Sequence, residues 1–194
     1  MALRPRNLDR RAKWRHRLAM LTLMLLRHAK SNWDNPADAD FDRPLAKRGQ
    51  KSAPRMGAEI AHLGLVPELV LCSSAARTRQ TLDLVLGSWP EPHPEVVFDD
   101  AIYMATPEDM LAQVRRVASR NPAPSRVMVV GHNPGMEDFA SDLAGHGDAE
   151  ARKLLAQKYP TCALAVLTFE AGSWSDVDFG AGNLERFITP AMLA

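Results

Sequence analysis

A nearly unbroken apolar run at positions 21–26 ends abruptly at Arg27 and His28, and this change constrains the fold more than any other feature of the chain. The run is too short to span a membrane and lacks the alternation of polar and apolar residues typical of a half-exposed strand. We therefore predict a buried strand of a parallel sheet. Open α/β sheets bind ligands just outside the carboxyl ends of such strands, so Arg27 and His28 are candidate site residues.

Length and composition indicate a globular protein. The chain has 194 residues, of which 46% are hydrophobic and 24% charged, values that exclude disordered, collagen-like and coiled-coil proteins. Cys72 and Cys162 are the only two cysteines and lie far apart, which argues against a disulfide framework or a thiolate metal site. We expect a cytoplasmic protein, because two unpaired thiols suit a reducing compartment and no stretch could form a transmembrane helix.

The basic residues are unevenly distributed. Seven of the 24 lie in the first 19 positions, and without that segment 17 basic and 22 acidic residues remain, a net charge of −5 that disfavours nucleic-acid binding. We expect residues 1–19 to be a basic extension and residues 20–194 to form a single domain. The extension has three interpretations: a dispensable segment before a natural start at Met20, an arm that binds a membrane or a partner, or a helix packed on the domain.

Buried strands alternate with helical stretches along the chain, which predicts a three-layer α/β/α sandwich with a mostly parallel central sheet. Ser73 and Ser74 are candidate N-caps of one helix, and Thr106 followed by Pro107 is a strong start for another. Further strands are predicted at 69–72, 95–98, 126–130 and 163–169, with 174–178 pairing antiparallel to the last. Helices are predicted within 45–63, where Pro54 marks a kink or a late start, and at 75–86, 107–120, 136–143 and 149–158.

Three of the predicted strands are followed by arginine or histidine side chains. The first delivers Arg27 and His28, the second leads to Arg77, and the fourth delivers His132. Parallel strands place their carboxyl ends at one edge, so these side chains can meet. Two arginines and two histidines predict a site for a phosphoryl dianion, because guanidinium groups match phosphate oxygens. A metal site is the competing use of paired histidines, but no carboxylate or thiolate lies at ligand spacing, and the arginines would repel a divalent cation. We expect neither a metal nor another cofactor.

Four segments, in order along the chain, resemble the motifs of the histidine phosphatase superfamily, and within it those of the SixA-type phosphohistidine phosphatases. They are LMLLRHAKS, DFDRPLAKRG, LCSSAARTRQT and VVGHNPGME, and the resemblance covers about residues 20 to 190. It implies a phosphoglycerate mutase-like fold. The first motif of the family is usually Arg-His-Gly; here Ala29 replaces the glycine, a change that recurs in the SixA-like branch.

The resemblance implies that His28 is a nucleophile that forms a phosphohistidine intermediate, and that Arg27, Arg77 and His132 form the phosphate pocket. The chemistry agrees, because a histidine must be neutral to attack phosphorus and nearby cations lower its pKa. The same cations stabilise the transferring group without a metal. Asp100 lies where larger family members carry a general acid; Asp99 competes with it, and an ordinary loop aspartate is the alternative. Arg43, Ser31 and Asn133 are candidate substrate-binding residues, for which loop, capping or turn roles are equally good explanations.

The spacing of Arg77 and His132 bears on the substrate. They are 55 positions apart, which leaves no room for the helical cap that the resemblance leads us to expect in sugar-phosphate mutases, so we expect no large cap domain. An uncapped pocket admits a side chain presented by another protein. We expect a hydrolase that dephosphorylates phosphohistidine on a partner, such as a phosphotransfer domain of a bacterial-type signalling relay. The alternatives are a small-molecule phosphomonoesterase with an open site and a non-catalytic phosphate-binding module.

Overall fold

The computed structural model describes residues 19–33, 35, 37 and 39–193, so the expected extension at 1–19 lies outside the described residues except for Ala19. Within this part, the chain forms one seven-stranded sheet with the strand order β3-β2-β4-β1-β6-β7-β5. The strands are β1 (Ala19–Arg27), β2 (Leu69–Cys72), β3 (Glu95–Phe98), β4 (Arg126–Gly131), β5 (Ala144–Gly147), β6 (Leu164–Ala171) and β7 (Gly182–Ile188). The α-helices are α1 (Lys47–His62), α2 (Ala76–Leu86), α3 (Pro107–Arg116), α4 (Gly135–Leu143) and α5 (Ala149–Gln157).

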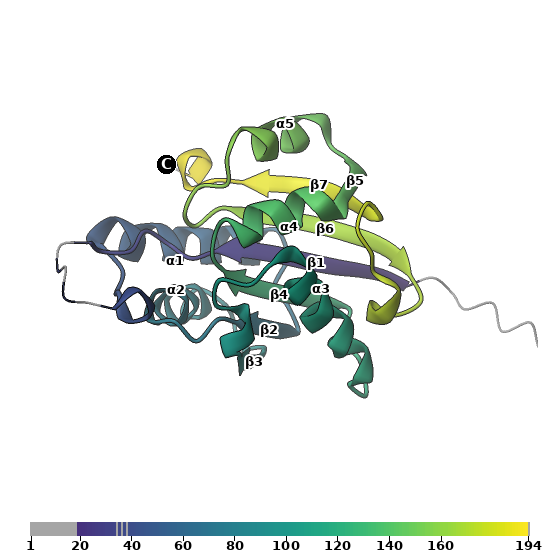
Figure 1. The fold of residues 1–194 in the computed structure, drawn as a ribbon, viewed down its shortest axis with the longest axis horizontal. Helices are drawn as coiled ribbons and strands as arrows, with labels where there is room; N and C mark the ends of the chain where they lie inside the picture. The colour runs from purple at the N-terminus through teal and green to yellow at the C-terminus, as the bar shows by residue number, and fades with distance from the viewer. Residues whose placement is uncertain (1–18, 34, 36, 38, 194) are drawn as a thin grey trace, which may run out of the picture.

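Strand direction divides the sheet into two halves. In the parallel half, β3-β2-β4-β1, every neighbouring pair is parallel. In the mixed half, β6 runs antiparallel to β1, β7 runs antiparallel to β6, and β5 runs parallel to β7. The sheet is therefore mostly parallel, as predicted. Because β7 runs in the same direction as β1, both strands end at the same edge, as their arrowheads in Figure 1 show.

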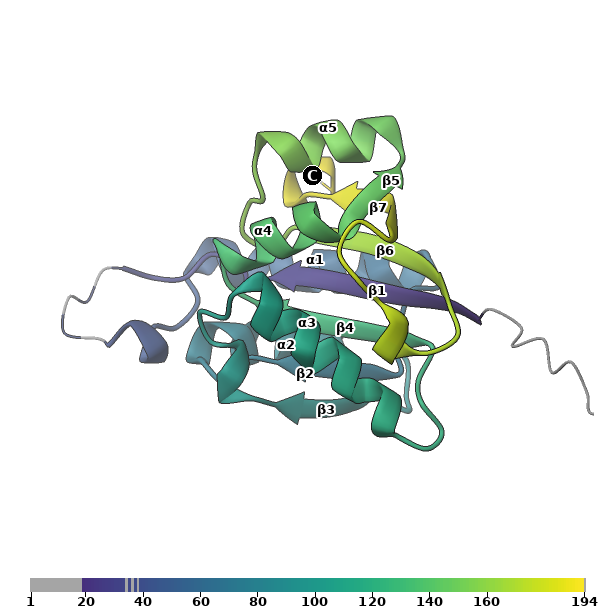
Figure 2. The ribbon, with the colours of Figure 1, turned by 45° about the vertical axis from the view of Figure 1, so that its right-hand side comes forward.

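Helices cover both faces of the sheet, which confirms the predicted three-layer sandwich (Figures 1 and 2). Leu23 and Leu25 of β1 belong to the core beneath α3, α4 and α5. Met24 and Leu26 point to the opposite face and belong to the core beneath α1 and α2. This two-residue alternation follows from the pleat of a strand. All four side chains are fully buried, and each such burial stabilises the fold by about 1.5–3 kcal/mol.

Two local predictions hold closely, and the strand predicted at 174–178 is wrong. Strands β2 and β3 have the predicted bounds, and α3 begins with Thr106 and Asp109 in a reciprocal capping box. The segment predicted as a strand at 174–178 instead contains the short 3-10 helix Trp174–Asp176. The side chain of Trp174 explains this, because it is buried and its indole Nε1 donates to the carbonyl of Pro124 at 2.6 Å. The antiparallel neighbour of β6 is β7.

The predicted serine caps of α2 are also wrong. The N-cap is Ala75, without a side-chain hydrogen bond, and the helix begins at Ala76 and ends at Leu86. Ser73 and Ser74 point to other partners, which are described with the site below. Pro54 lies inside α1 and does not delay its start at Lys47.

The first turn of α1 packs directly on the segment that follows β1. The amide of Ala46 donates to the carbonyl of Lys30 at 2.8 Å. A Cβ on Gly49 would lie 2.3 Å from the same carbonyl oxygen, so only glycine fits this close approach. The helix start is thereby fixed beside the end of β1. No helix in the described part of the chain is both long and apolar enough to cross a bilayer.

Candidate active site

A cavity of about 410 Å³ lies at the carboxyl ends of β1 and β4, beside the first turn of α2. The four side chains that the sequence places at strand ends all line it, and the ring centroids of His28 and His132 are 5.2 Å apart. The structure thus brings together residues separated by more than a hundred positions. The lining residues are Arg27, His28, Lys30, Ser31, Trp33, Asp40, Arg77, Tyr103, Met104, His132, Asn133 and Thr161.

His28 is buried directly after β1 and held in one tautomer. Its Nδ1 lies 2.7 Å from the carbonyl oxygen of Ala29, and a carbonyl only accepts, so Nδ1 carries the hydrogen and Nε2 keeps its lone pair. The amide of Ala29 donates to Thr81 Oγ1 at 2.9 Å, which anchors this turn to α2. Burial, followed by the charges of Arg77 and Arg27, lowers the pKa of His28 to about 4. The imidazole is therefore neutral at neutral pH, with burial as the larger cause.

Arg77 joins His132 to a carboxylate. Its Nε donates to His132 Nδ1 at 3.1 Å, and its Nη2 donates to Asp40 Oδ2 at 3.0 Å. Its Nη1 also donates to the backbone carbonyl of Asp40. Because an arginine only donates, His132 accepts at Nδ1 and carries its hydrogen on Nε2, which lies 2.8 Å from Ser73 Oγ. Burial and the neighbouring Arg77 lower the pKa of His132 to about 3.

Arg27 approaches the cavity from the end of β1. Its Nη1 donates to the backbone carbonyl of Tyr159, a residue that precedes β6. Its Nε is buried and has no hydrogen-bond acceptor within the described residues. A buried unpaired N–H group costs about 1–3 kcal/mol, so an oxyanion that accepted from this nitrogen would remove that cost.

Asp40 and Tyr103 complete the cavity, and the sequence analysis missed both. Asp40 Oδ2 accepts from the hydroxyl of Tyr103 at 2.7 Å as well as from Arg77, and its Oδ1 lies 3.4 Å from Arg43 Nη1. The Tyr103 hydrogen bond, with help from both arginines, lowers the pKa of Asp40. Asp40 lies in a short 3-10 helix, Asp40–Asp42, inside the predicted loop. An acid beside predicted strand-end cations was a usable indication, but the sequence did not reveal where this loop folds back.

The secondary candidates fall into two groups. Ser31 and Asn133 line the cavity; Ser31 is buried, and Asn133 Nδ2 donates to Glu137 Oε2 at 2.7 Å. Arg43 does not line it but lies behind Asp40, with its guanidinium 3.5 Å from the ring centroid of Trp33.

The two candidate acids lie outside the cavity. Asp100 is exposed and its carboxylate accepts from the hydroxyl of Ser74. Asp99 accepts from the amide of Ala101 at 2.8 Å and thereby caps the 3-10 helix Asp100–Ile102. The structure brings neither carboxylate to the histidine pair, so the acid that the family pattern indicated has no supporting geometry here.

Comparison with known proteins agrees with this geometry. The profile of the histidine phosphatase superfamily (branch 1) matches residues 23–102. An uncharacterised protein of Mycobacterium tuberculosis is 36% identical over 85% of this chain and 99% of its own length. A crystal structure from Agrobacterium tumefaciens, provisionally described as the phosphohistidine phosphatase SixA, is 30% identical, with a TM-score of 0.71 over 88% of this chain and 99% of that one. The chain belongs to the histidine phosphatase superfamily.

The fold of this histidine phosphatase is the one that its motifs imply. A phosphoglycerate mutase from Bacillus anthracis, only 14% identical, superposes with a TM-score of 0.60 over 84% of this chain and 97% of its own. Between Arg77 and His132 the described chain contains β3, α3, β4 and short 3-10 turns, and no cap domain. Among the described residues, no group of three or more histidine, cysteine, aspartate or glutamate side chains could hold a metal ion.

Proposed function

We propose that this histidine phosphatase removes the phosphoryl group from a phosphohistidine on a partner protein, without a metal, by way of a phosphorylated His28. The observation that carries the proposal is the buried, neutral His28, whose Nε2 lone pair shares one cavity with Arg27, Arg77 and His132. A neutral imidazole is a competent nucleophile toward phosphorus. The guanidinium groups supply the positive charge that the transferring phosphoryl group requires.

The reaction proceeds in two displacements. In the first, His28 Nε2 forms a bond to phosphorus while the bond to the substrate imidazole breaks, and the leaving ring takes a proton from water. In the second, a water molecule attacks the phosphorus, the bond to His28 breaks, and inorganic phosphate leaves. His132 keeps its ring neutral through burial, and its Nδ1 accepts from Arg77 Nε, which holds that guanidinium at the cavity.

The carboxylate of the cavity favours a phosphohistidine over an alkyl phosphate. Asp40 is the one carboxylate that lines the cavity among the described residues, and its hydrogen bond from Tyr103 lowers its pKa. It is therefore ionised at neutral pH and has no proton to give to a leaving alkoxide. A phosphohistidine has a labile P–N bond and a nitrogen leaving group, which needs less acid assistance.

The mouth of the cavity favours a protein substrate. Trp33 and Met104 line it and are 64% and 54% exposed, respectively. Exposed apolar side chains around a site are typical of surfaces that bind other proteins. The provisional description of the 30% identical structure as a phosphohistidine phosphatase also supports this substrate class.

A small-molecule phosphomonoesterase is the second candidate. The volume of about 410 Å³ lies within the range of about 300–1,000 Å³ that small-molecule sites occupy. The two functions differ in the substrates that are turned over. A non-catalytic phosphate-binding module would turn over neither class.

The test compares a phosphohistidine-bearing phosphotransfer domain with a panel of phosphate monoesters, each with and without EDTA. We expect turnover of the phosphoprotein, no effect of EDTA, and an acid-labile phosphoryl adduct on His28 in a quenched reaction. His28→Ala should lower the rate by at least about a thousandfold, because the attacking group is lost. His62→Ala, which removes an exposed histidine outside the cavity, should leave the rate unchanged.

Three results would contradict the proposal. Faster turnover of an ester would favour the monoesterase, and inhibition by EDTA would reject a metal-independent reaction. An adduct on another residue would remove His28 from the chemistry.

A further inference from the structure

A groove with a basic rim begins at the active-site cavity and extends toward the C-terminal end of the chain. It consists of two adjoining hollows of about 280 and 360 Å³. Thr161 lines both the active-site cavity and the first hollow. Arg48, Pro190 and Ala191 line both hollows, so the surface is continuous from the cavity onward. We call this surface the basic groove, and its charged residues are Arg48, Lys51, Arg55 and Lys158.

The topology of the sheet explains why the groove lies beside the site. Strand β7 ends at the same edge as β1, and the short 3-10 helix Pro190–Leu193 follows it there. The segment before β6 turns at this edge as well, and the amide of Cys162 donates to the carbonyl of His28 at 3.0 Å. The first turn of α1, which carries Arg48, is held at the same edge by the close approach of Gly49 to Lys30. Three separate elements therefore form the groove next to the cavity.

The charges of the groove have no structural partner. Arg48, Lys51, Arg55 and Lys158 are all exposed, and none forms an ion pair within the described residues. Arg48, Lys51 and Arg55 follow one another at helical spacing on α1, whose first turn contains no acid. Cations at a helix N-terminus oppose the helix dipole, and like charges at this spacing repel, so the helix loses stability by carrying them. This cluster of four positive charges also contrasts with the net charge of −5 over residues 20–194.

Apolar surface lies between these cations. Leu154, Pro160, Phe187 and Pro190 line the first hollow, and no acid among the residues that the structure describes lines either hollow. A surface of this kind, apolar at its centre with charge at its rim, is the usual composition of a protein-binding site.

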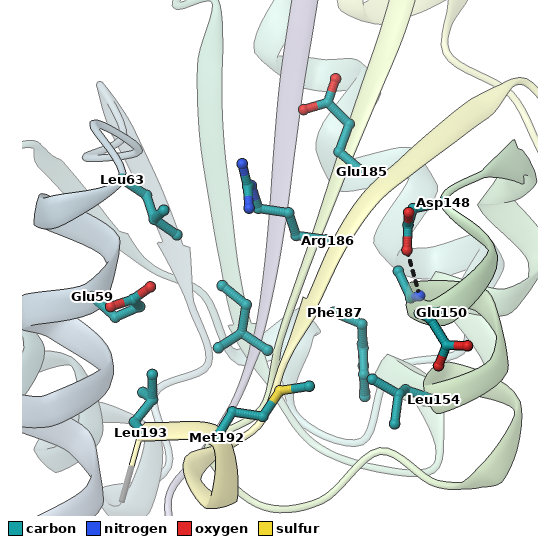
Figure 3. Close-up of a pocket in the computed structure, with 12 residues that line it drawn as sticks. Glu59, Leu63, Asp148, Glu150, Leu154, Glu185, Arg186, Phe187, Met192 and Leu193 are labelled. Carbon is teal, nitrogen blue, oxygen red and sulfur yellow. Dashed lines mark hydrogen bonds between the residues drawn. The ribbon is translucent and has the colours of Figure 1, made fainter.

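The opposite sign appears on the other side of the C-terminal 3-10 helix. Figure 3 shows a separate hollow there, of about 410 Å³, in which Glu59 of α1 faces Asp148, the N-cap of α5, and Glu150 of α5, with Met192 and Leu193 below them. Glu185 and Arg186 of β7 lie between these walls. Glu59 is farther along α1 than Arg48, and thus farther from the edge that carries the site. The lining of these hollows therefore changes from basic beside the cavity to largely acidic farther from it.

We infer that the basic groove is a docking surface for the phosphoprotein substrate, and that it selects partners with acidic residues beside the phosphohistidine. This inference rests on the proposed function. Complementary charge around an interface speeds association and excludes partners of the wrong sign, with little effect on the chemical step. The groove therefore acts on KM and kcat/KM, while the residues around His28 determine kcat.

Two synthetic peptides test the inference without the native partner. Each contains one histidine, phosphorylated with phosphoramidate, and is flanked by glutamates in one peptide and by lysines in the other. We expect kcat/KM to be at least about tenfold higher for the acidic peptide at low salt, with the ratio falling as ionic strength rises, because exposed charges are screened. Free phosphohistidine provides the rate of the chemistry without docking.

The double variant Arg48→Glu with Lys158→Glu should reduce the ratio to one or below and leave the rate with free phosphohistidine unchanged. The matched control is Arg116→Glu with Arg152→Glu, which makes the same charge change at exposed positions outside the groove and should keep the preference. Equal kcat/KM for both peptides in the wild type, or a preference for lysines, would overturn the docking inference while the phosphatase activity stands. Failure to hydrolyse either peptide or free phosphohistidine would overturn the proposed function instead.

Discussion

In the parallel half of the sheet, the ends of β1 and β4 and the helix after β2 deliver both histidines and both arginines of the cavity. Among the described residues, the mixed half delivers only Thr161, just before β6. Both halves contribute to the same two core layers. The difference lies in which strands end side by side. β1 and β4 are adjacent and parallel, so the residues that follow them meet. In the mixed half, β6 runs the opposite way, and β7 ends at the same edge as β1 but is separated from it by β6. The mixed half instead contributes a supporting carbonyl, that of Tyr159, which holds Arg27.

The sharpest way to test this division is to remove Arg77. Arg77→Ala should lower kcat by at least about a hundredfold, because one donor to the transferring phosphoryl group is lost and His132 loses its partner at Nδ1. Arg77→Lys should recover only part of the rate, since an ammonium cannot reproduce the planar fork that spans His132 and Asp40.

Arg126 provides the control in the same half of the sheet. It lies at the opposite end of β4 and pairs with Glu68. Arg126→Ala should leave kcat within about twofold of the wild type, because exposed ion pairs contribute about 0–1 kcal/mol to stability and this one is remote from the cavity. An unchanged rate in Arg77→Ala would place Arg77 outside the reaction and remove the basis of the comparison.

The pH dependence provides the next test. Since burial lowers the pKa of His28 to about 4, kcat/KM should stay level as pH falls from about 8 to about 5, and should fall about tenfold per pH unit only below about 4. A loss of activity centred near 6.5, the ordinary value, would show that the imidazole is not buried as described. The measurement is an initial-rate profile with a phosphate monoester or phosphopeptide, corrected for spontaneous hydrolysis in acid and for the titration of the substrate's own phosphoryl group at about pH 6.

The same groups link pH to folding. The unfolded chain binds protons on His28 and His132 near the ordinary pKa, while the folded chain does not until about 4 and about 3. The two neutral histidines therefore leave the free energy of unfolding undiminished above about pH 6.5. As pH falls below that value, the unfolded chain binds protons that the folded chain does not, and the free energy of unfolding decreases.

The smallest expected effect comes from a matched pair of core truncations. Val130 of β4 and Val166 of β6 are both fully buried in the same core layer. Each valine-to-alanine change should lower the free energy of unfolding by about 1–3 kcal/mol. Only Val130→Ala, two residues before His132, should also lower kcat, by about tenfold, because small displacements of reacting groups are costly. The measurements are urea unfolding and kcat on both variants. Equal kcat values would show that packing in the parallel half matters no more for catalysis than packing in the mixed half.

The parallel half was also the more predictable half. Continuous apolar runs indicated β1, β2 and β4, and the residues after them were the right ones to bring together. The capping box at Thr106 likewise predicted the start of α3. All of these features are local in the sequence, which is why they could be predicted from it.

The mixed half was less predictable because long-range pairing decides it. Strand β5 is the short segment Ala144–Gly147, which has no β-branched residue, and it forms only because β7 pairs with it. Gly147 has a φ of 141° and no room for a Cβ beside the backbone of Leu184. In β7, the adjacent charged residues Glu185 and Arg186 interrupt the expected alternation, and the pairing with β6 shifts register there.

The cavity was predictable only where it follows strands. Asp40 was not predicted as a site residue, because it reaches Arg77, 37 positions away, only through the folding of a loop. Ser73 looked like a helix cap but is buried against His132. Asp100 matched a family position, and yet its carboxylate is directed at Ser74. Each of these three depends on how loops close in space, which spacing alone does not determine.

The bond between Asp40 and Arg77 gives the enzyme a tethered competitor. Inorganic phosphate left after turnover has to hold the guanidinium against a carboxylate that cannot diffuse away, and a tethered group competes at an effective concentration on the order of millimolar or higher. Product inhibition by phosphate is thus expected to be weak, and an Asp40→Ala enzyme should slow markedly as phosphate accumulates.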